Sequence, residues 1–171
     1  MKTLCLVLTS VLVAALAAPL ATAAQEPRAA DFPGFIEDST AAYEHRKGRL
    51  VDIETFNRMA SGGALILDTR SREAYDLRHI RGAVHLNFSD ITSESLKRTI
   101  GDPDRPILIY CNNNILSDPY AFARKTISMA LNIPSFVTLY TYGYRNVYEL
   151  ETVLEVTDTR LKLEGEPLPQ S

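Results

Sequence analysis

Residues 64–70 read ALILDTR, and residues 106–111 read PILIYC. Each stretch contains an unbroken aliphatic run, and apolar and polar positions do not alternate within it. Such a run is typical of a strand that is buried on both faces, as in a parallel sheet covered by helices. The two stretches therefore predict the core strands of an α/β domain.

Helical signals surround the two runs. Asp52 is a good N-cap for a helix at 52–61, because its side chain can accept a backbone hydrogen bond, and the pair Gly62-Gly63 ends that helix. The other elements expected in this half are a helix at 38–46 capped by Ser39 or Thr40, a helix at 71–79, a short strand at 83–87, and a helix at 92–100 capped by Thr92 or Ser93.

The second half of the chain continues the alternation. Asp118 followed by Pro119 predicts the start of a helix at 118–132, because proline is favoured at the first helical position. SFVTLY at 135–140 predicts a third core strand, and YRNVYELETVL at 144–154 predicts a last helix. The fold class that follows is α/β, with an open, mainly parallel sheet flanked by helices on both faces.

The first 23 residues have the pattern of a secretory signal peptide. A lone Lys2 precedes an apolar block from Leu4 to Ala18, and the small residues Ala21 and Ala23 follow it. The block is too short and too rich in alanine for a comfortable membrane anchor. We therefore expect cleavage after Ala23, with the next bond as the alternative, and a periplasmic or secreted protein that has no membrane contact after cleavage.

The domain boundaries follow from these signals. We divide the chain into a signal peptide at 1–23, an N-terminal extension at 24–49, one domain at 50–160 and a C-terminal tail at 161–171. Loss of Lys2 changes the formal net charge from −3 to −4, and about 148 of the 171 residues remain, enough for one core. The mild acidity and the lack of a basic run argue against nucleic-acid binding.

Cysteine usage limits the chemistry. Cys5 lies in the signal peptide, so Cys111 is the only cysteine of the mature chain and an internal disulfide is impossible. The cysteine pairs of a zinc site are also missing, and no metal or organic cofactor is implied. Two interpretations remain open for Cys111: a buried structural residue or a reactive thiol.

Cys111 ends a predicted strand, which is where ligands bind in parallel α/β sheets. The helix expected from residue 118 would direct its free N–H groups at the preceding loop, favour a thiolate and cradle an anion. Cys111 is thus the candidate catalytic nucleophile. The candidate substrate-binding residues are those of the loop: Asn112, Asn113, Asn114, Ile115, Leu116 and Ser117.

The stretch LILDTRSREAYDLRHIRGAVHL at 65–86 resembles the first signature of rhodanese domains. The stretch LYTYGYRNVYEL at 139–150 is similar to a weakened second signature, which keeps only Gly143 of its usual glycine pair. The resemblance covers about residues 50–155. Positions that match the first signature are Asp68, Arg70, Glu73, Tyr75, His79, Ile80, Gly82 and Ala83.

The resemblance implies a sulfurtransferase. Cys111 would take a sulfane sulfur from a small donor such as thiosulfate, hold it as a persulfide, and pass it to a thiophilic acceptor, either a thiol or cyanide. Asp68 and Arg70 would support the site by bracing neighbouring loops through hydrogen bonds and an ion pair. His79 would fix the turn before the next strand.

The loop departs from the family pattern, because active members usually have glycines and a cation there. Asparagine tolerates the left-handed conformation that glycine would supply, so the loop can keep its shape without its charge. Thiosulfate would then be held less strongly, unless Arg70, Arg72, Arg124 or Arg145 supplies the cation from outside the loop. The rival interpretation is a non-catalytic rhodanese-like module that binds a protein partner or a small ligand.

Ser117 separates this loop from that of the tyrosine and dual-specificity phosphatases. Those enzymes need an arginine six positions after their cysteine to hold the phosphate, and Ser117 stands at that position here. Phosphatase activity is therefore not expected.

Overall fold

In the computed structural model of the chain, residues 29–165 are described, so the predicted signal peptide lies outside the described part. Among these residues, no helix is both long enough and apolar enough to cross a membrane.

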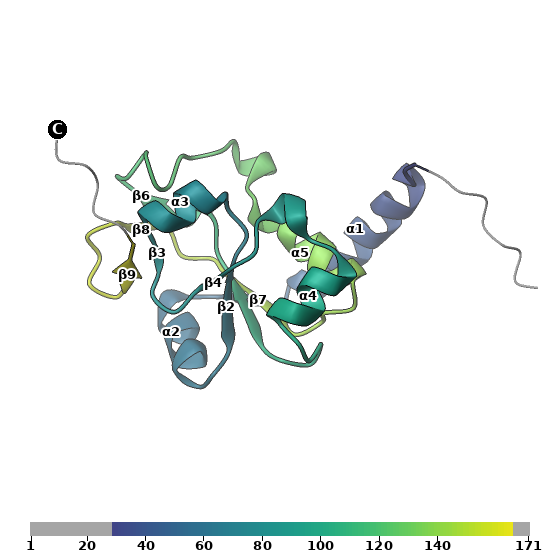
Figure 1. Cartoon of the computed structure of the whole chain (residues 1–171), viewed down its shortest axis with the longest axis horizontal. Coiled ribbons are helices and arrows are strands. Elements are labelled where there is room, and N and C mark those ends of the chain that lie inside the picture. The colour runs from purple at the N-terminus through teal and green to yellow at the C-terminus, as the bar shows by residue number, and fades with distance from the viewer. Residues whose placement is uncertain (1–28, 166–171) are drawn as a thin grey trace, which may run out of the picture. The chain divides into compact units, whose positions relative to one another are not determined.

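Within the described residues, the central sheet has five strands, and all neighbouring pairs are parallel. The strand order is β1-β7-β5-β2-β4, which puts β5 in the middle of the sheet. The two aliphatic runs of the sequence form β2 and β5, which lie side by side (Figure 1). The strands are β1 (Leu50–Val51), β2 (Leu65–Asp68), β4 (Val84–His85), β5 (Ile107–Ile109) and β7 (Val147–Leu150).

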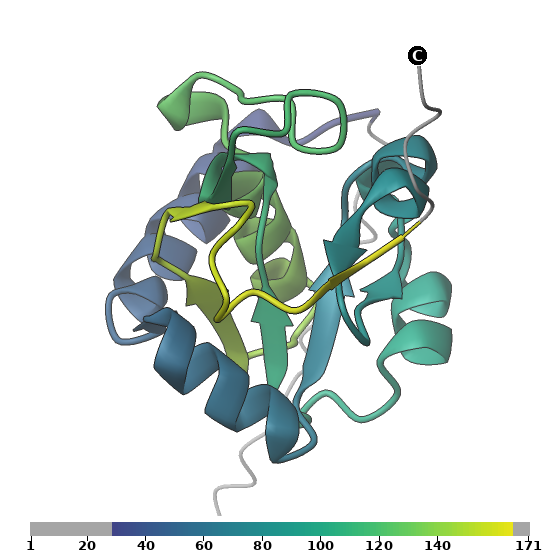
Figure 2. The same cartoon turned by 90° about the vertical axis from the view of Figure 1, so that its left-hand side faces the viewer.

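Helices cover both faces of this sheet. Side chains alternate along a strand, so Ile66 and Leu108 pack on the face of α2 (Ile53–Ser61) and α3 (Arg72–Leu77). Leu65 and Leu67 pack on the opposite face, in a cluster that includes side chains of α1 (Phe32–Arg46), α4 (Ser93–Thr99) and α5 (Asn132–Thr141). In Figure 2, α2 lies in front of the sheet and α5 behind it. The predicted fold class is confirmed.

Short elements complete the domain. β3 (His79–Ile80) pairs with β9 (Leu163–Glu164) in an antiparallel manner, so part of the segment predicted as a C-terminal tail takes part in the fold. β6 (Ile115–Leu116) pairs in parallel with β8 (Leu154–Glu155). The 3₁₀ helices are η1 (Phe88–Asp90), η2 (Asn112–Asn114) and η3 (Ile127–Met129).

Helices α2 and α4 start at their predicted caps, Asp52 and Thr92, and Ser71 caps α3 in the same way without having been predicted as a cap. The side chains of Asp52, Ser71 and Thr92 accept hydrogen bonds from backbone N–H groups in the first turns of α2, α3 and α4. Helix α1 differs, because it begins at Phe32 instead of residue 38. Pro33 lies in its first turn, where the missing N–H costs no hydrogen bond.

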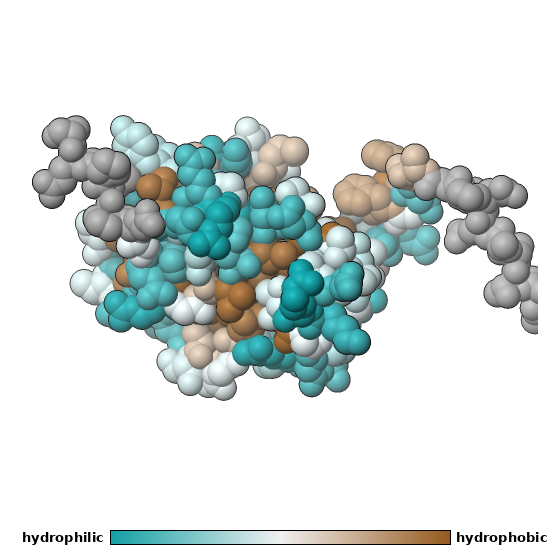
Figure 3. All heavy atoms as spheres, viewed as in Figure 1, coloured by the Kyte–Doolittle hydropathy of each residue, from teal (hydrophilic) through white to brown (hydrophobic). Residues whose placement is uncertain are grey.

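The amino end of α1 exposes apolar side chains. Phe32, Phe35 and Ile36 have exposed fractions of 70%, 54% and 53%. Figure 3 shows this apolar surface at the amino end of the helix. Ala42 is the buried residue of α1 and belongs to the apolar cluster beside α5, so the carboxyl half of the helix attaches it to the domain.

The prediction of a helix at 118–132 is wrong. Asp118 does cap a turn, since its side chain accepts from the Ala121 N–H at 3.1 Å, but the chain does not continue as a helix. The side chain of Asn113 instead binds the backbone N–H and C=O of Lys125, at 2.8 and 2.9 Å. A side chain that takes up these backbone groups competes with the helical hydrogen bonds.

The next two predicted elements are also wrong, because their types are exchanged. Residues 135–140, predicted as a strand, lie in α5, and residues 147–150, predicted as part of a helix, form β7. A short apolar run does not distinguish a buried strand from a buried helix. Phe136 and Leu139 stand three positions apart and are both buried, as expected for one face of a helix.

Candidate active site

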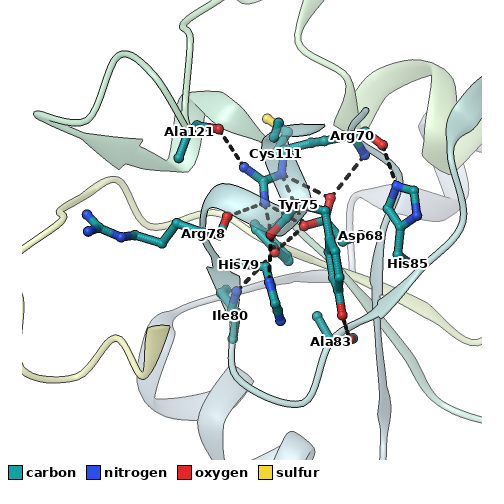
Figure 4. A network of polar contacts seen from close by, with 12 residues as sticks. Asp68, Arg70, Tyr75, Arg78, His79, Ile80, Ala83, His85, Cys111 and Ala121 are labelled. Atoms are coloured by element: carbon teal, nitrogen blue, oxygen red, sulfur yellow. Dashed lines mark hydrogen bonds and ion pairs between the residues drawn. The ribbon is translucent and has the colours of Figure 1, made fainter. Parts of the chain in front are cut away.

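The carboxyl ends of β2, β5 and β7 lie side by side, and the candidate site residues follow them. Asp68 ends β2, Arg70 follows two residues later, and Cys111 lies two residues beyond the end of β5. Ligands of parallel α/β sheets bind beyond these ends, so Cys111 lies at the centre of the expected binding edge. Figure 4 shows Cys111 and the Asp68–Arg70 pair in this region.

The thiol of Cys111 is covered, since only 2% of the residue is exposed. Burial, the largest effect, raises the pKa of the thiol above its usual value, and Glu149 adds to the rise. The backbone N–H groups of Asn113, Asn132 and Asn114 hydrogen-bond to the sulfur and lower the same pKa, but they do not outweigh burial. The prediction that this position favours a thiolate is therefore wrong for the arrangement in this structure.

A helix N-terminus does lie at the sulfur, but it belongs to a different helix from the one expected. Asn132 is the first residue of α5, and its backbone N–H is directed at Cys111. The positive end of the α5 dipole thus replaces that of the helix predicted from residue 118. An outer sulfur that carries negative charge would meet N–H donors at this position.

The three asparagines of the predicted binding loop hold the backbone around the thiol. Asn112 donates to the Ala123 carbonyl at 2.8 Å. Asn114 is buried, accepts from the Cys111 N–H at 2.9 Å and donates to the Leu150 carbonyl at 2.8 Å. The side-chain N–H groups of these two residues are thus committed to the loop and to β7.

The other three residues of that loop point to neighbouring elements. Ile115 is buried in the apolar cluster on the α2 face, and Leu116 pairs with Glu155 of β8. Ser117 is exposed, donates to the Glu155 carboxylate at 2.6 Å and has a φ of 64°. Its left-handed backbone lies in the region where glycine costs least.

Asp68 and Arg70 form a fully buried ion pair, with 2.6 Å between Arg70 Nη2 and Asp68 Oδ2 (Figure 4). Arg70 also donates to the carbonyls of Ala121 and Arg78, at 2.8 Å each. The Tyr110 hydroxyl donates to the same carboxylate. The ion pair and hydrogen bonds expected from the sequence are present, and they commit the guanidinium to neighbouring loops.

Two of the other arginines considered as anion ligands have contacts of their own. Arg72 pairs with Asp76 at 2.8 Å on the surface of α3. The Arg145 guanidinium lies 3.4 Å from the centre of the Tyr140 ring. Arg124 is exposed on the segment between η2 and α5. None of these contacts places an arginine at the sulfur.

The histidine side chains hold backbone turns. His79 Nδ1 lies 2.7 Å from the Tyr75 carbonyl, and its ring stacks on the Tyr75 ring with 3.7 Å between the centres. His85 Nε2 lies 2.9 Å from the Arg70 carbonyl. These contacts agree with the expectation that His79 fixes the turn before the next strand.

Sequence reasoning missed a polar cluster beside the thiol. Glu149 of β7 is buried and pairs with Arg46 of α1, with 2.5 Å between Arg46 Nε and Glu149 Oε2. The Asn132 side chain donates to the Glu149 and Asn114 side chains, at 3.3 Å each. The signal was a lone acidic residue among apolar neighbours in NVYEL, which was hidden because this stretch was assigned to a helix.

Two amide oxygens at the site are buried without a hydrogen-bond partner: Oδ1 of Asn112 and Oδ1 of Asn132. Their orientation is fixed, because the Asn112 nitrogen faces a carbonyl and the Asn132 nitrogen faces two acceptors. Buried polar atoms rarely lack a partner, so these oxygens are acceptors available to a bound group. No cluster of three or more metal-ligating side chains occurs among residues 29–165.

We expect the protein to lose stability as the pH rises above about 10. Burial, the largest effect, and then the Asp68 carboxylate raise the pKa of Tyr110 well above its usual value. The unfolded phenol releases its proton near pH 10, so the folded state binds more protons and the free energy of unfolding falls with rising pH. Cys111, whose pKa is raised by burial, adds to the fall from about pH 8.5 upward.

Urea unfolding at pH values from about 8 to about 11 measures this slope. The matched variant is Tyr110→Phe, which keeps the ring and removes the ionisable group. Its slope above about pH 10 should be shallower than that of the wild type. An unchanged slope would show that the alkaline loss has another source.

A family model described as "Rhodanese-like domain" matches residues 52–152. The matched segment includes the central strand β5, Cys111 and the Asp68–Arg70 pair. Helix α1 and the pairing strand β9 lie outside it.

The curated relatives include the thiosulfate sulfurtransferase GlpE of Coxiella burnetii, in the strains RSA 331 and RSA 493. The identity is 29% over 69 residues, which is 40% of this chain and 62% of the relative. The chain thus spans about three fifths of the length of these curated relatives.

Similar solved structures include the crystal structure of the Alr3790 protein from Anabaena sp. and the solution NMR structure of hp1203 from Helicobacter pylori 26695. Their sequence identities are 22% and 15%, and both TM-scores are 0.44. The matches cover 67% and 71% of this chain, and 91% and 93% of the two structures.

Proposed function

Because the chain belongs to the rhodanese-like domain family, we propose that it is a sulfurtransferase in which Cys111 carries the transferred sulfur as a persulfide. The observation that carries this proposal is the position of the thiol. It follows the central strand β5 at the carboxyl edge of the sheet, and three backbone N–H groups hydrogen-bond to its sulfur. That arrangement suits a sulfur nucleophile whose product bears negative charge.

The reaction has two displacement steps. The Cys111 thiol loses its proton to solvent, and the thiolate attacks the sulfane sulfur of the donor. A new S–S bond forms as the bond between that sulfur and the donor's carrier group breaks, and the carrier group leaves with the electron pair. An acceptor thiolate or cyanide then attacks the outer sulfur, and the Cys111 thiolate is released for the next cycle.

The N–H groups of Asn113, Asn114 and Asn132 stabilise the persulfide in this scheme. The outer sulfur extends one bond beyond the position of the thiol and carries the negative charge of the intermediate. Donors that are already oriented cost no reorganisation when that charge develops. The resting thiol is buried and its pKa is raised by that burial, so the donor must reach it through an opening of the covering chain.

We expect an alkyl persulfide to load Cys111 at least about tenfold faster than thiosulfate does. Thiosulfate is a dianion, and the guanidinium of Arg70 is already committed to Asp68. The carboxylate of Glu149 lies in the polar cluster beside the sulfur and opposes further negative charge. Intact-mass spectrometry after timed incubation with each donor measures the gain of one sulfur atom per chain.

The control for this measurement is Cys111→Ser, in which no sulfur should be retained. Faster loading by thiosulfate would contradict the donor preference but leave the sulfurtransferase proposal in place. If neither donor loads while Cys111 still reacts with iodoacetamide, the sulfurtransferase proposal fails. The non-catalytic binding module then becomes the better interpretation.

A further inference from the structure

Glu149 and Cys111 lie on the same face of the sheet. Glu149 of β7 stands beside Ile109 of β5 in the strand register, and Cys111 follows Ile109 by two residues. Side chains two positions apart in an extended chain point to the same side. That side is the one covered by α1 and α5.

Asn132 connects the two residues. Its side-chain nitrogen donates to Glu149 Oε1 at 3.3 Å and to Asn114 Oδ1 at the same distance, while its backbone N–H hydrogen-bonds to the Cys111 sulfur. Asn132 is also the first residue of α5. The carboxylate of Glu149 therefore anchors the helix end that lies against the thiol.

Arg46 pairs with this carboxylate through two hydrogen bonds. Nε donates to Glu149 Oε2 at 2.5 Å, and Nη2 donates to Oε1 at 2.7 Å. The Glu149 side chain is 7% exposed and that of Arg46 is 28% exposed. Arg46 lies in the last turn of α1, which packs along α5 (Figure 1) and precedes the segment matched by the family model.

We propose that the Arg46–Glu149 ion pair is a positioning pair for Cys111, through which α1 sets the charge felt by the reactive sulfur. The inference rests on the proposed function only in taking Cys111 as the reactive group. The carboxylate holds Asn132 in place and opposes the thiolate, and the guanidinium offsets that opposition. The N-terminal helix is thereby a part of the reactive site.

Charges on the other elements near Cys111 are paired or exposed. On the α3 side of the sheet, Asp68 is bound to Arg70, and Asp118 is bound to Arg78 at 2.7 Å. Lys125 lies on the segment between β6 and η3, and its side chain is exposed. After burial itself, the Glu149 carboxylate is the side-chain charge that raises the Cys111 pKa. The Arg46–Glu149 pair is therefore the place at which a single charge change acts on the thiol most directly.

The test is the pH dependence of Cys111 alkylation by iodoacetamide in the purified mature chain, from about pH 7 to about pH 11. The first variant is Glu149→Gln, because a glutamine oxygen still accepts from Arg46 and Asn132. Removal of one charge beside the thiol should shift the alkylation midpoint to lower pH and raise the rate at pH 7 about three- to tenfold. The rate plateau at high pH should stay at the wild-type value.

Arg46→Gln should have the opposite effect, slowing alkylation at pH 7 about three- to tenfold, because Glu149 then lacks its counter-charge. The alkylation midpoint of the double variant Arg46→Gln/Glu149→Gln should lie close to that of the wild type. If Arg46→Gln does not fold, the alkylation midpoints of Glu149→Gln and of the double variant still test the proposal. The matched control is Lys47→Gln, which removes the neighbouring cation of an exposed pair with Glu44 and should leave the curve unchanged.

A merely structural pair would give a different result. Loosening of the fold exposes the thiol and raises the plateau in both single variants, without moving the midpoints in opposite directions. That outcome, or an unchanged midpoint in Glu149→Gln, would overturn the inference. Alkylation does not require sulfur transfer, so a shifted midpoint without persulfide loading would support the positioning pair while the proposed function fails.

Discussion

A Cys111→Ser variant is expected to lose sulfur transfer by a factor of at least about a thousand. The serine hydroxyl is a far weaker nucleophile near neutral pH than a thiolate, and it cannot hold a sulfane sulfur in the same linkage. The fold should survive, because the three N–H groups directed at the sulfur can donate to the smaller hydroxyl oxygen. Transfer of sulfur from an alkyl persulfide to a thiol acceptor gives the readout.

Cys111→Ala is the companion variant for this prediction. It removes the acceptor as well as the nucleophile, so a difference in stability between the two variants reports on the N–H donors and not on catalysis. Both should be equally inactive. A Cys111→Ser protein that keeps more than about a tenth of wild-type turnover would rule out the nucleophile assignment.

Arg70→Met is expected to lower the free energy of unfolding by about 3–5 kcal/mol. The Asp68 carboxylate would remain fully buried without its counter-charge, and the carbonyls of Ala121 and Arg78 would each lose a donor. Methionine keeps much of the side-chain length, so the loss measures charge and hydrogen bonding more than volume. Urea unfolding at pH 7 gives the difference.

Arg72→Met provides the matched control two residues away. Arg72 also pairs with an aspartate, but its side chain is 70% exposed. Solvent screens such a pair, so the free energy of unfolding should stay close to that of the wild type. Equal losses in the two variants would show that burial of the Asp68–Arg70 pair does not decide its contribution.

The sequence predicted the first half of the fold well, because local signals and tertiary contacts agree there. Asp52 and Thr92 cap helices that tertiary packing also requires, and the aliphatic runs are long enough to identify β2 and β5. After Cys111 the local sequence signals and the tertiary contacts disagree. The cap at Asp118 forms one turn only, since Asn113 takes up the backbone groups of Lys125.

The place of Cys111 after a buried strand could be predicted from the sequence, but its surroundings could not. Assigning β7 to a helix hid Glu149, whose place beside the thiol depends on strand register. Arg46 is distant in sequence and reaches the site through packing of α1 on α5. The pKa of the thiol was predicted from a nearby helix terminus, whereas burial, which a sequence does not display, has the larger effect.

The covered position of Cys111 also bears on how readily its sulfur is oxidised. Peroxides react with the thiolate form of an accessible cysteine and can carry it irreversibly to sulfinic and sulfonic acids. Burial raises the pKa of the resting thiol and keeps its sulfur out of reach of solvent. Cys111 is the free cysteine of the described residues, so no neighbouring thiol in that part of the chain would rescue a sulfenic acid as a disulfide. Shielding the sulfur between turnovers thus preserves the one atom on which the proposed chemistry depends.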